Sequence, residues 1–367
     1  MRSLYLNFDQ ESAVNVHRLL SFRSTRGVLV PNLELLEWDT STALLGLLHL
    51  FLSPCLRHVT FCPHLPHGPS RVSPGHFAPL VQMISSLPSL EHLSVLYDNG
   101  KEESFQNAVF SFICRFGSSL KSFETRMPLS EAAILLLATL PNLSSWGTPQ
   151  APPQSFPKPI FPSLKKLRLF KPEALQWLER LPSGENGMLQ NDSGLAIQST
   201  NTTEMLEFIQ CPGNPTINSE LLSSITKFRN LVTLVVDVRC CWGGRGECDF
   251  RLTDDDMENL ATTLTRLKFL WLGAPCRYET CKNTVASLMS ISVHCLDLES
   301  LETHFITRGI AGDMQRLLDE AAWHGKPKCK VQELRTTELL LDASEAPEGW
   351  ETIKRGYKLI FPHLRNL

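Results

Sequence analysis

The sequence has no apolar run long enough to cross a membrane and no large excess of charge of either sign. Its longest apolar stretch, residues 44–52, contains Gly46 and His49 and falls well short of the roughly 20 residues that a membrane-spanning helix needs. An acidic residue, Asp9, precedes any possible signal-peptide core. The formal net charge is only −3. We therefore expect an intracellular protein, cytoplasmic or nuclear, with no nucleic-acid or membrane partner.

The sequence also lacks the short motifs that mark common enzyme sites. G-x-G-x-x-G, P-loop, G-x-S-x-G and H-E-x-x-H patterns are all missing. Asp254, Asp255 and Asp256 resemble a metal-binding acidic run, but they stand where a helix cap belongs. We expect no enzymatic activity and no cofactor. The alternative is a catalytic domain whose site assembles only in three dimensions.

What the sequence does contain is one leucine pattern, repeated from end to end. The clearest copy is Phe161-Pro-Ser-Leu164-Lys-Lys-Leu167-Arg-Leu169, in which a leucine is followed three residues later by a second and two residues later by another apolar residue. Copies begin at Leu33, Leu56, Leu90, Leu120, Leu143, Leu164, Leu231, Leu267, Leu301 and Leu364. Two intervals, after Leu164 and after Leu301, are about twice as long as the others, so each is expected to hide a degenerate copy, the second near Val331.

The end of each copy alternates with period two, which is typical of a short strand with one buried face. Between copies the apolar spacing is helical, as at Met257, Leu260, Ala261 and Leu264. Ser130 before Glu131 and Thr253 before three acids are expected to cap helices. One strand-plus-helix unit cannot bury both apolar faces alone, whereas stacked units share a continuous core.

We therefore predict an α/β solenoid of leucine-rich repeats, an arc or horseshoe with a parallel concave sheet and outer helices. Residues 1–367 are expected to form one array, with proline-rich loops at residues 62–74 and 149–162 and a loosely ordered insertion at residues 182–218. The chain opens inside a copy, so an upstream segment is expected. The alternative is a leucine-rich globular α/β domain in which the pattern occurs by chance.

The copies Phe161-Pro-Ser-Leu-Lys-Lys-Leu-Arg-Leu169 and Leu87-Pro-Ser-Leu-Glu-His-Leu-Ser-Val95, together with the irregular spacing, resemble the leucine-rich-repeat part of fungal F-box proteins. The resemblance implies a substrate receptor of an SCF ubiquitin ligase, in which the repeats bind the substrate and an N-terminal F-box binds the SCF adaptor. No F-box-like Leu-Pro-x-Glu start is recognisable here, so an adaptor partner requires an F-box upstream. The alternative is a scaffold with no link to a ligase.

A protein partner is expected on the concave face, which is reached by the residue between the last two apolar positions of each copy. Through the chain these residues are Tyr5, Glu37, Thr60, Ser94, Glu124, Gly147, Arg168, Val235, Trp271 and Phe305. A neighbouring exposed row includes Glu34, Arg57, Glu91, Lys121 and Lys165. Large apolar side chains and arginine on such a wall are typical of binding hot spots. We predict a partner-binding patch of Arg168, Val235, Trp271 and Phe305, unless a loop covers them or the register is displaced by one residue and they are core.

Five cysteines follow two successive strands and could lie in neighbouring loops. They are Cys240, Cys241, Cys248, Cys276 and Cys281. Close thiolates could hold zinc or pair on oxidation, but these spacings match no standard zinc module. We expect free thiols and no metal.

Overall fold

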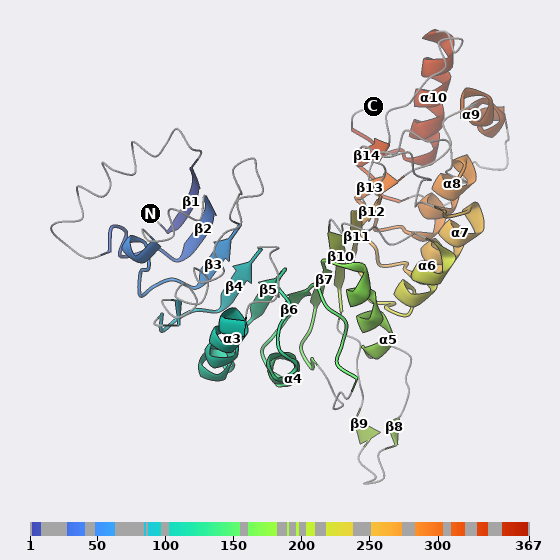
Figure 1. Cartoon of the computed structure of the whole chain (residues 1–367). Helices are drawn as coiled ribbons and strands as arrows, with labels where there is room; N and C mark the ends of the chain where they lie inside the picture. Colours follow the sequence, from blue (N-terminus) through green and yellow to red (C-terminus); the bar gives the residue numbers. More distant parts are fainter. Residues whose placement is uncertain are drawn as a thin grey trace, which may run out of the picture. The chain divides into compact units, whose positions relative to one another are not determined.

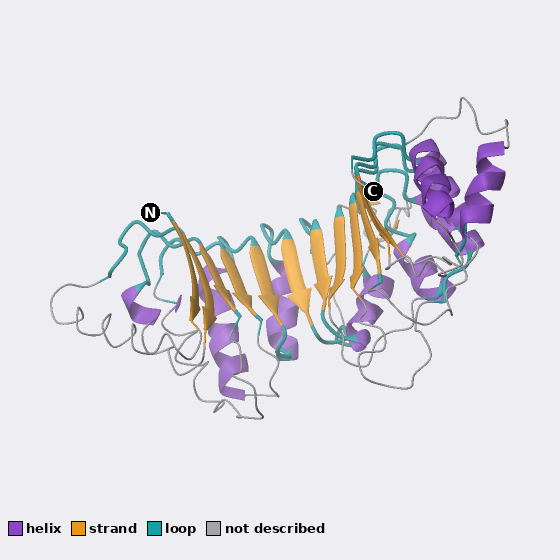
Figure 2. Cartoon of the chain, turned by 90° about the horizontal axis from the view of Figure 1, so that it is seen from above, coloured by secondary structure: helices purple, strands orange, loops and turns teal. Residues whose placement is uncertain are grey.

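Figures 1 and 2 show the computed structural model of the chain. It describes residues 2–8, 28–40, 48–62, 84–85, 87–96, 103–154, 161–181, 189–190, 196–197, 203–209, 218–237, 251–273, 283–303, 310–319, 329–336 and 347–365. The chain divides into two compact units, Met1–Leu164 (unit 1) and Lys165–Leu367 (unit 2). Both units combine parallel strands with helices, which confirms the α/β class predicted from the sequence. The expectation of one array through both units stays a prediction.

Unit 1 contains parallel strands that neighbour one another in chain order. These are β1 (Ser3–Phe8), β2 (Leu35–Thr40), β3 (His58–Phe61), β4 (His92–Val95), β5 (Ser122–Thr125) and β6 (Ser145–Thr148). Two helices, α3 (Glu103–Phe116) and α4 (Glu131–Thr139), lie on one side of the strands (Figure 1).

Unit 2 has the same arrangement. Its parallel strands, in the order in which they neighbour one another, are β7 (Lys166–Leu169), β10 (Met205–Ile209), β11 (Thr233–Asp237), β12 (Phe269–Leu272), β13 (Ser300–Thr303) and β14 (Glu333–Thr336). The helical segments are η5 (Pro172–Gln176), α5 (Trp177–Arg180), α6 (Ser219–Ile225), α7 (Asp254–Thr263), α8 (Val285–His294), α9 (Ile310–Asp319) and α10 (Pro347–Ile360). Two short antiparallel strands, β8 (Leu189–Gln190) and β9 (Ala196–Ile197), form a separate pair. Helices α6, α7 and α8 lie on one side of the strands (Figure 1).

The leucine pattern produces this arrangement because most of its apolar positions are buried. In the copy that ends in β7, Leu164 is 2 % exposed and Leu167 and Leu169 are fully buried. The first leucine closes the turn before the strand, and the other two point toward the helices. Burying each such side chain contributes about 1.5–3 kcal/mol, so every copy adds to one core shared with its neighbours.

Backbone hydrogen bonds join successive copies at the same position. The amide that follows the first leucine donates to the carbonyl at the same position of the preceding copy, as from Glu34 to Arg2 (2.8 Å) and from Arg57 to Glu34 (2.9 Å). In unit 2 the series ends with Arg365, whose amide donates to Gln332 at 3.1 Å. The copy that starts at Leu364 therefore continues the ladder beyond β14.

Both long intervals contain the degenerate copies that the spacing predicted. In the first interval β10 pairs with β7 and β11, and Thr203, 4 % exposed, takes the place of the first leucine. In the second interval β14 follows fully buried Val331. Because β10 lies within residues 182–218, part of the expected insertion is a regular strand. Most of the loop at residues 62–74 and residues 155–160 of the other proline-rich loop lie outside the described residues.

The predicted helix caps are confirmed. Ser130 caps α4 by accepting a hydrogen bond from the Ala133 amide at 3.2 Å. Thr253 and Asp256 form a capping box at the start of α7, in which each side chain accepts from the backbone amide of the other residue. The pKa of Asp256 is lowered by hydrogen bonds from Thr253 and Ser219, although burial opposes this shift. The acidic run therefore serves the helix start.

Candidate partner-binding face

Alternation along the strands decides which side chains reach the open face of unit 2, the face opposite the helices. In β7 Lys166 and Arg168 are partly exposed while their neighbours are buried. In β12 Phe269 and Trp271 are exposed or partly exposed, and Leu270 and Leu272 are buried. The residues between the last two apolar positions therefore face outward, and the alternative of a register displaced by one residue is wrong for β7 and β12.

Strand register brings three of the four predicted residues into one row. Arg168 lies opposite Glu207, Glu207 opposite Val235, and Val235 opposite Trp271. Glu302 and then Arg335 continue the row on β13 and β14. Glu207 was not predicted, because β10 belongs to a degenerate copy.

The fourth predicted residue, Phe305, lies outside the described residues. The copy that ends in β13 begins at fully buried Leu298, not at Leu301, which is also fully buried and takes the second apolar position. Glu302 therefore occupies the outward position assigned to Phe305. The prediction counted this copy three residues too late because it took Leu301, the second core position, as the first; the last core position is Thr303, which is 3 % exposed.

Three apolar side chains lie together on β11 and β12, and we call Val235, Phe269 and Trp271 the apolar patch. Val235 and Trp271 are directly opposite each other, and Phe269 is two residues before Trp271 on the same face. Phe269 is 44 % exposed. Sequence reasoning missed it because only one outward position per copy was read, although period two assigns two.

The indole of Trp271 is fixed by a hydrogen bond within its own strand end. Its Nε1 donates to the carbonyl oxygen of Gly273 at 3.0 Å, and the Gly273 amide donates to the carbonyl of Val236 at 2.7 Å. Gly273 has a φ of 83°, a conformation that favours glycine. The polar atom of the indole is thus satisfied, and its ring is oriented before any partner arrives, which lowers the entropy lost on binding.

A charged cluster stands beside the apolar patch on β7 and β10. Glu207, 9 % exposed, accepts a hydrogen bond from Nε of Arg168, and its other carboxylate oxygen lies 3.4 Å from Nζ of Lys166. A nearly buried carboxylate is tolerated when cations and hydrogen bonds surround it. Arg168 is therefore held in place by Glu207, which lies between Arg168 and Val235 in the row.

The second predicted row forms ion pairs between successive copies, and we call it the charge row. Glu91 lies 2.8 Å from Lys121 and 3.9 Å from Arg57, and Lys165 lies 3.4 Å from Glu204. Arg2 with Glu34 and Lys268 with Glu299 follow the same rule. Opposite charges at adjacent strand positions stabilise the pairing of the strands, so the charge row is engaged within the protein.

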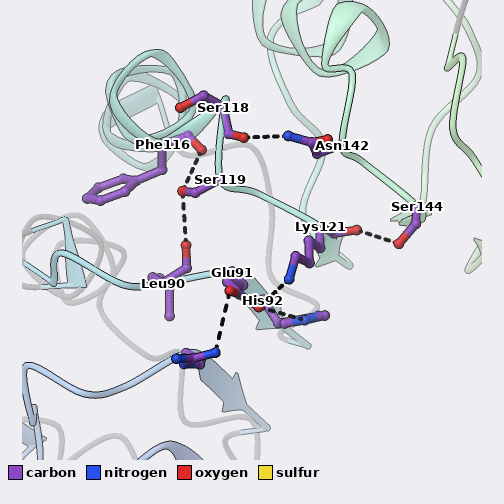
Figure 3. A network of polar contacts seen from close by, with 10 residues as sticks. Leu90, Glu91, His92, Phe116, Ser118, Ser119, Lys121, Asn142 and Ser144 are labelled. Carbon is purple, nitrogen blue, oxygen red and sulfur yellow. Dashed lines mark hydrogen bonds and ion pairs between the residues drawn. The ribbon is translucent and has the colours of Figure 1, made fainter.

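The open face of unit 1 is polar. Glu124, 6 % exposed, accepts hydrogen bonds from the hydroxyls of Ser94 and Ser145 at 3.5 and 3.4 Å. Figure 3 shows the polar network around Glu91, in which Lys121 also receives a bond at its carbonyl from the hydroxyl of Ser144 at 3.1 Å. Such contacts join neighbouring copies, and Tyr5, 57 % exposed on β1, takes part in them by donating a hydrogen bond from its hydroxyl to Asp39 at 2.9 Å.

The predicted thiol cluster of Cys240, Cys241, Cys248, Cys276 and Cys281 lies outside the described residues. Within the described part of the chain Cys55, Cys62, Cys114, Cys295 and Cys329 are free thiols. Burial raises the pKa of Cys295 to about 12 and that of Cys329 to about 11, so both are protonated and unreactive at neutral pH. The same described ranges contain no group of three His, Cys, Asp or Glu side chains that could hold a metal ion.

Among the helices that the structure describes, none is long and apolar enough to cross a membrane. In comparisons with known proteins, no family model matches the chain and no curated protein matches it significantly.

Proposed function

We propose that the copies are leucine-rich repeats of a solenoid, and that the chain is a protein-binding module. The support for the fold is the leucine pattern itself, which recurs in each unit with the same buried positions and the same backbone hydrogen bonds between copies. A repeat array offers a long sheet face on which contacts with a partner can be distributed.

The observation that carries the binding proposal is the apolar patch on the open face of unit 2. Exposed aromatic side chains contribute little to folding stability. A Trp whose indole N–H already has a hydrogen-bond acceptor is a typical binding anchor. Arg168, held by Glu207 one strand beyond the patch, supplies a cation of fixed orientation. The partner docks on this face, with Trp271 as the principal anchor.

By its resemblance to fungal F-box proteins, the module is the substrate-recognition part of an SCF ubiquitin-ligase receptor that acts in the cytoplasm or nucleus. The support is the shared repeat pattern and the patch, which corresponds to the part of such receptors that holds the substrate. A scaffold without a ligase link would use the same face, so the two functions differ in which other proteins accompany the partner.

The test is affinity purification of the tagged chain from its own cells, compared with Trp271→Ala and Phe110→Ala variants. Phe110 is a matched control because it is an aromatic side chain that is 37 % exposed on α3 of unit 1, whereas the patch belongs to unit 2. We expect a bound protein that is lost with Trp271→Ala, by about 30-fold or more in affinity for a hot spot worth 2 kcal/mol, and retained with Phe110→Ala.

Recovery of the SCF adaptor and a cullin with that protein supports the receptor function. Recovery of the Trp271-dependent protein without them supports a scaffold. If no bound protein depends on Trp271 while circular dichroism shows both variants folded, the patch is not the binding site and the proposal fails.

A further inference from the structure

Two histidines stack on the open face of unit 1. His58 on β3 and His92 on β4 are directly opposite in the strand register. Their ring centroids are 3.9 Å apart and their planes differ by 9°. Their register neighbours on the outer sides, Leu35 on β2 and Ser122 on β5, carry no charge.

The charged groups around the pair come from the charge row. Arg57 precedes His58, Glu91 precedes His92, and Lys121 precedes Ser122 on the next strand. Glu91 lies 4.0 Å from Nε2 of His92, but it also accepts a hydrogen bond from Lys121 at 2.8 Å and pairs with Arg57 at 3.9 Å. Two cations therefore already share the nearest carboxylate before either imidazole takes up a proton.

We propose that His58 and His92 form a proton-sensitive element of unit 1, in which neutral stacked rings join β3 to β4 and protonation separates the rings and weakens that join. Two imidazolium rings cannot remain face to face at this distance, because like charges repel and both rings would be drawn out of the sheet face toward water. The element would make the open face of unit 1 respond to acidification, independently of the patch on unit 2.

The direction of the pH effect follows from the surroundings. Burial, followed by repulsion from His58, lowers the pKa of His92 from 6.5 to about 4, with Lys121 adding to the shift and Glu91 opposing it. Burial also lowers the pKa of His58, with Arg57 and Lys121 adding to the shift and Glu91 opposing it. Because the unfolded chain takes up these protons at a higher pH, folding stability is lost as the pH falls from about 6.5 toward about 4.

The first experiment is an NMR titration of the full chain with ¹⁵N-labelled histidine, with signals assigned by loss in His58→Phe and His92→Phe variants. We expect His92 to titrate near pH 4, which corresponds to a proton affinity about 300-fold weaker than that of an ordinary histidine. In His58→Phe, which keeps a flat ring, the His92 midpoint should rise because one positive neighbour is removed. A wild-type midpoint near 6.5 would overturn the proposal.

Two matched variants test the charges around the pair. Glu91→Gln should lower the His92 midpoint, because the opposing carboxylate is lost, and Lys121→Gln should raise it, because a cation is lost. Shifts in the same direction, or none, would show that the charge row does not control the pair.

The second experiment measures the urea midpoint of wild type, His92→Phe and His92→Asn from pH 7.5 to 4.5. The wild-type midpoint should fall more steeply below pH 6.5 than that of either variant, because the wild type carries two histidines with a lowered pKa and the variants keep only His58. If all three curves are parallel, protonation of His92 does not weaken the fold and the proposal is wrong. Two substitutions are used so that a folding defect in one does not decide the result.

Discussion

The contact between helices α7 and α8 allows a sharp prediction about Asp254. Its Oδ1 accepts hydrogen bonds from the Thr284 amide (2.8 Å) and the Ser287 hydroxyl, and its Oδ2 accepts one from the Thr284 hydroxyl (2.7 Å). Thr284 is the N-cap of α8. Hydrogen bonds to a charged acceptor contribute about 1.5–3 kcal/mol each but are not additive. Asp254→Ala also leaves Ser287, 1 % exposed, without its acceptor, so we expect a loss of about 2–4 kcal/mol.

Asp255→Ala is the matched control for this prediction. Asp255 is exposed and lies in the same first turn of α7, so its removal loses only a favourable interaction with the helix dipole, about 0.3–1 kcal/mol. The assay is urea unfolding followed by circular dichroism, with hydrogen exchange at the Thr284 and Ala286 amides to locate the effect in α8. An Asp254→Ala loss no larger than that of Asp255→Ala would refute the reasoning, since the hydrogen bonds would then contribute nothing.

Three further substitutions test other contacts, each by urea unfolding. Gly356→Ala should destabilise unit 2 by roughly 1–3 kcal/mol, because the new Cβ would overlap the side chain of Met314, which is fully buried; an unchanged midpoint would show that α9 and α10 separate freely. Trp146→Ala should cost about 3–5 kcal/mol because this side chain is fully buried, and a loss below 1 kcal/mol would contradict its place in the core. Glu91→Lys should cost about 1 kcal/mol and the double exchange with Lys121→Glu should recover most of it; equal losses would show that the pair is not coupled.

Most of the fold could be predicted from the sequence because one leucine pattern specifies the turn, the strand and the buried face of each copy. The spacing of Leu164, Leu167 and Leu169 specifies the turn before a strand, the strand itself and its buried face. Degenerate copies could be located only through the length of the gaps. In them Thr203 and Val331 fill the first position well enough to be buried, but a search for leucine does not find them.

The candidate site was predicted less completely, and the reason is the register. Trp271 and Val235 were placed correctly because leucines or valines occupy every core position around them. Near β13 two leucines three residues apart, Leu298 and Leu301, can each be read as the start of a copy, and the later start reaches Phe305 in place of Glu302. The spacing of leucines alone does not decide which of two leucines three residues apart begins the copy.

The charge row and the apolar patch have different roles: the first acts in strand pairing and the second in binding. Exposed ion pairs contribute only about 0–1 kcal/mol each, but a sequence in which opposite charges meet at successive copies favours the correct neighbour for each strand and disfavours displaced pairings. Phe269 is exposed and Trp271 is partly exposed, so their burial on folding is incomplete and adds little stability. Neither side chain carries a charge that could favour the correct neighbouring strand. Their position is therefore better explained by contact with another protein than by stability. It follows that charge exchange in the row should change unfolding and leave binding intact, whereas Trp271→Ala should do the reverse.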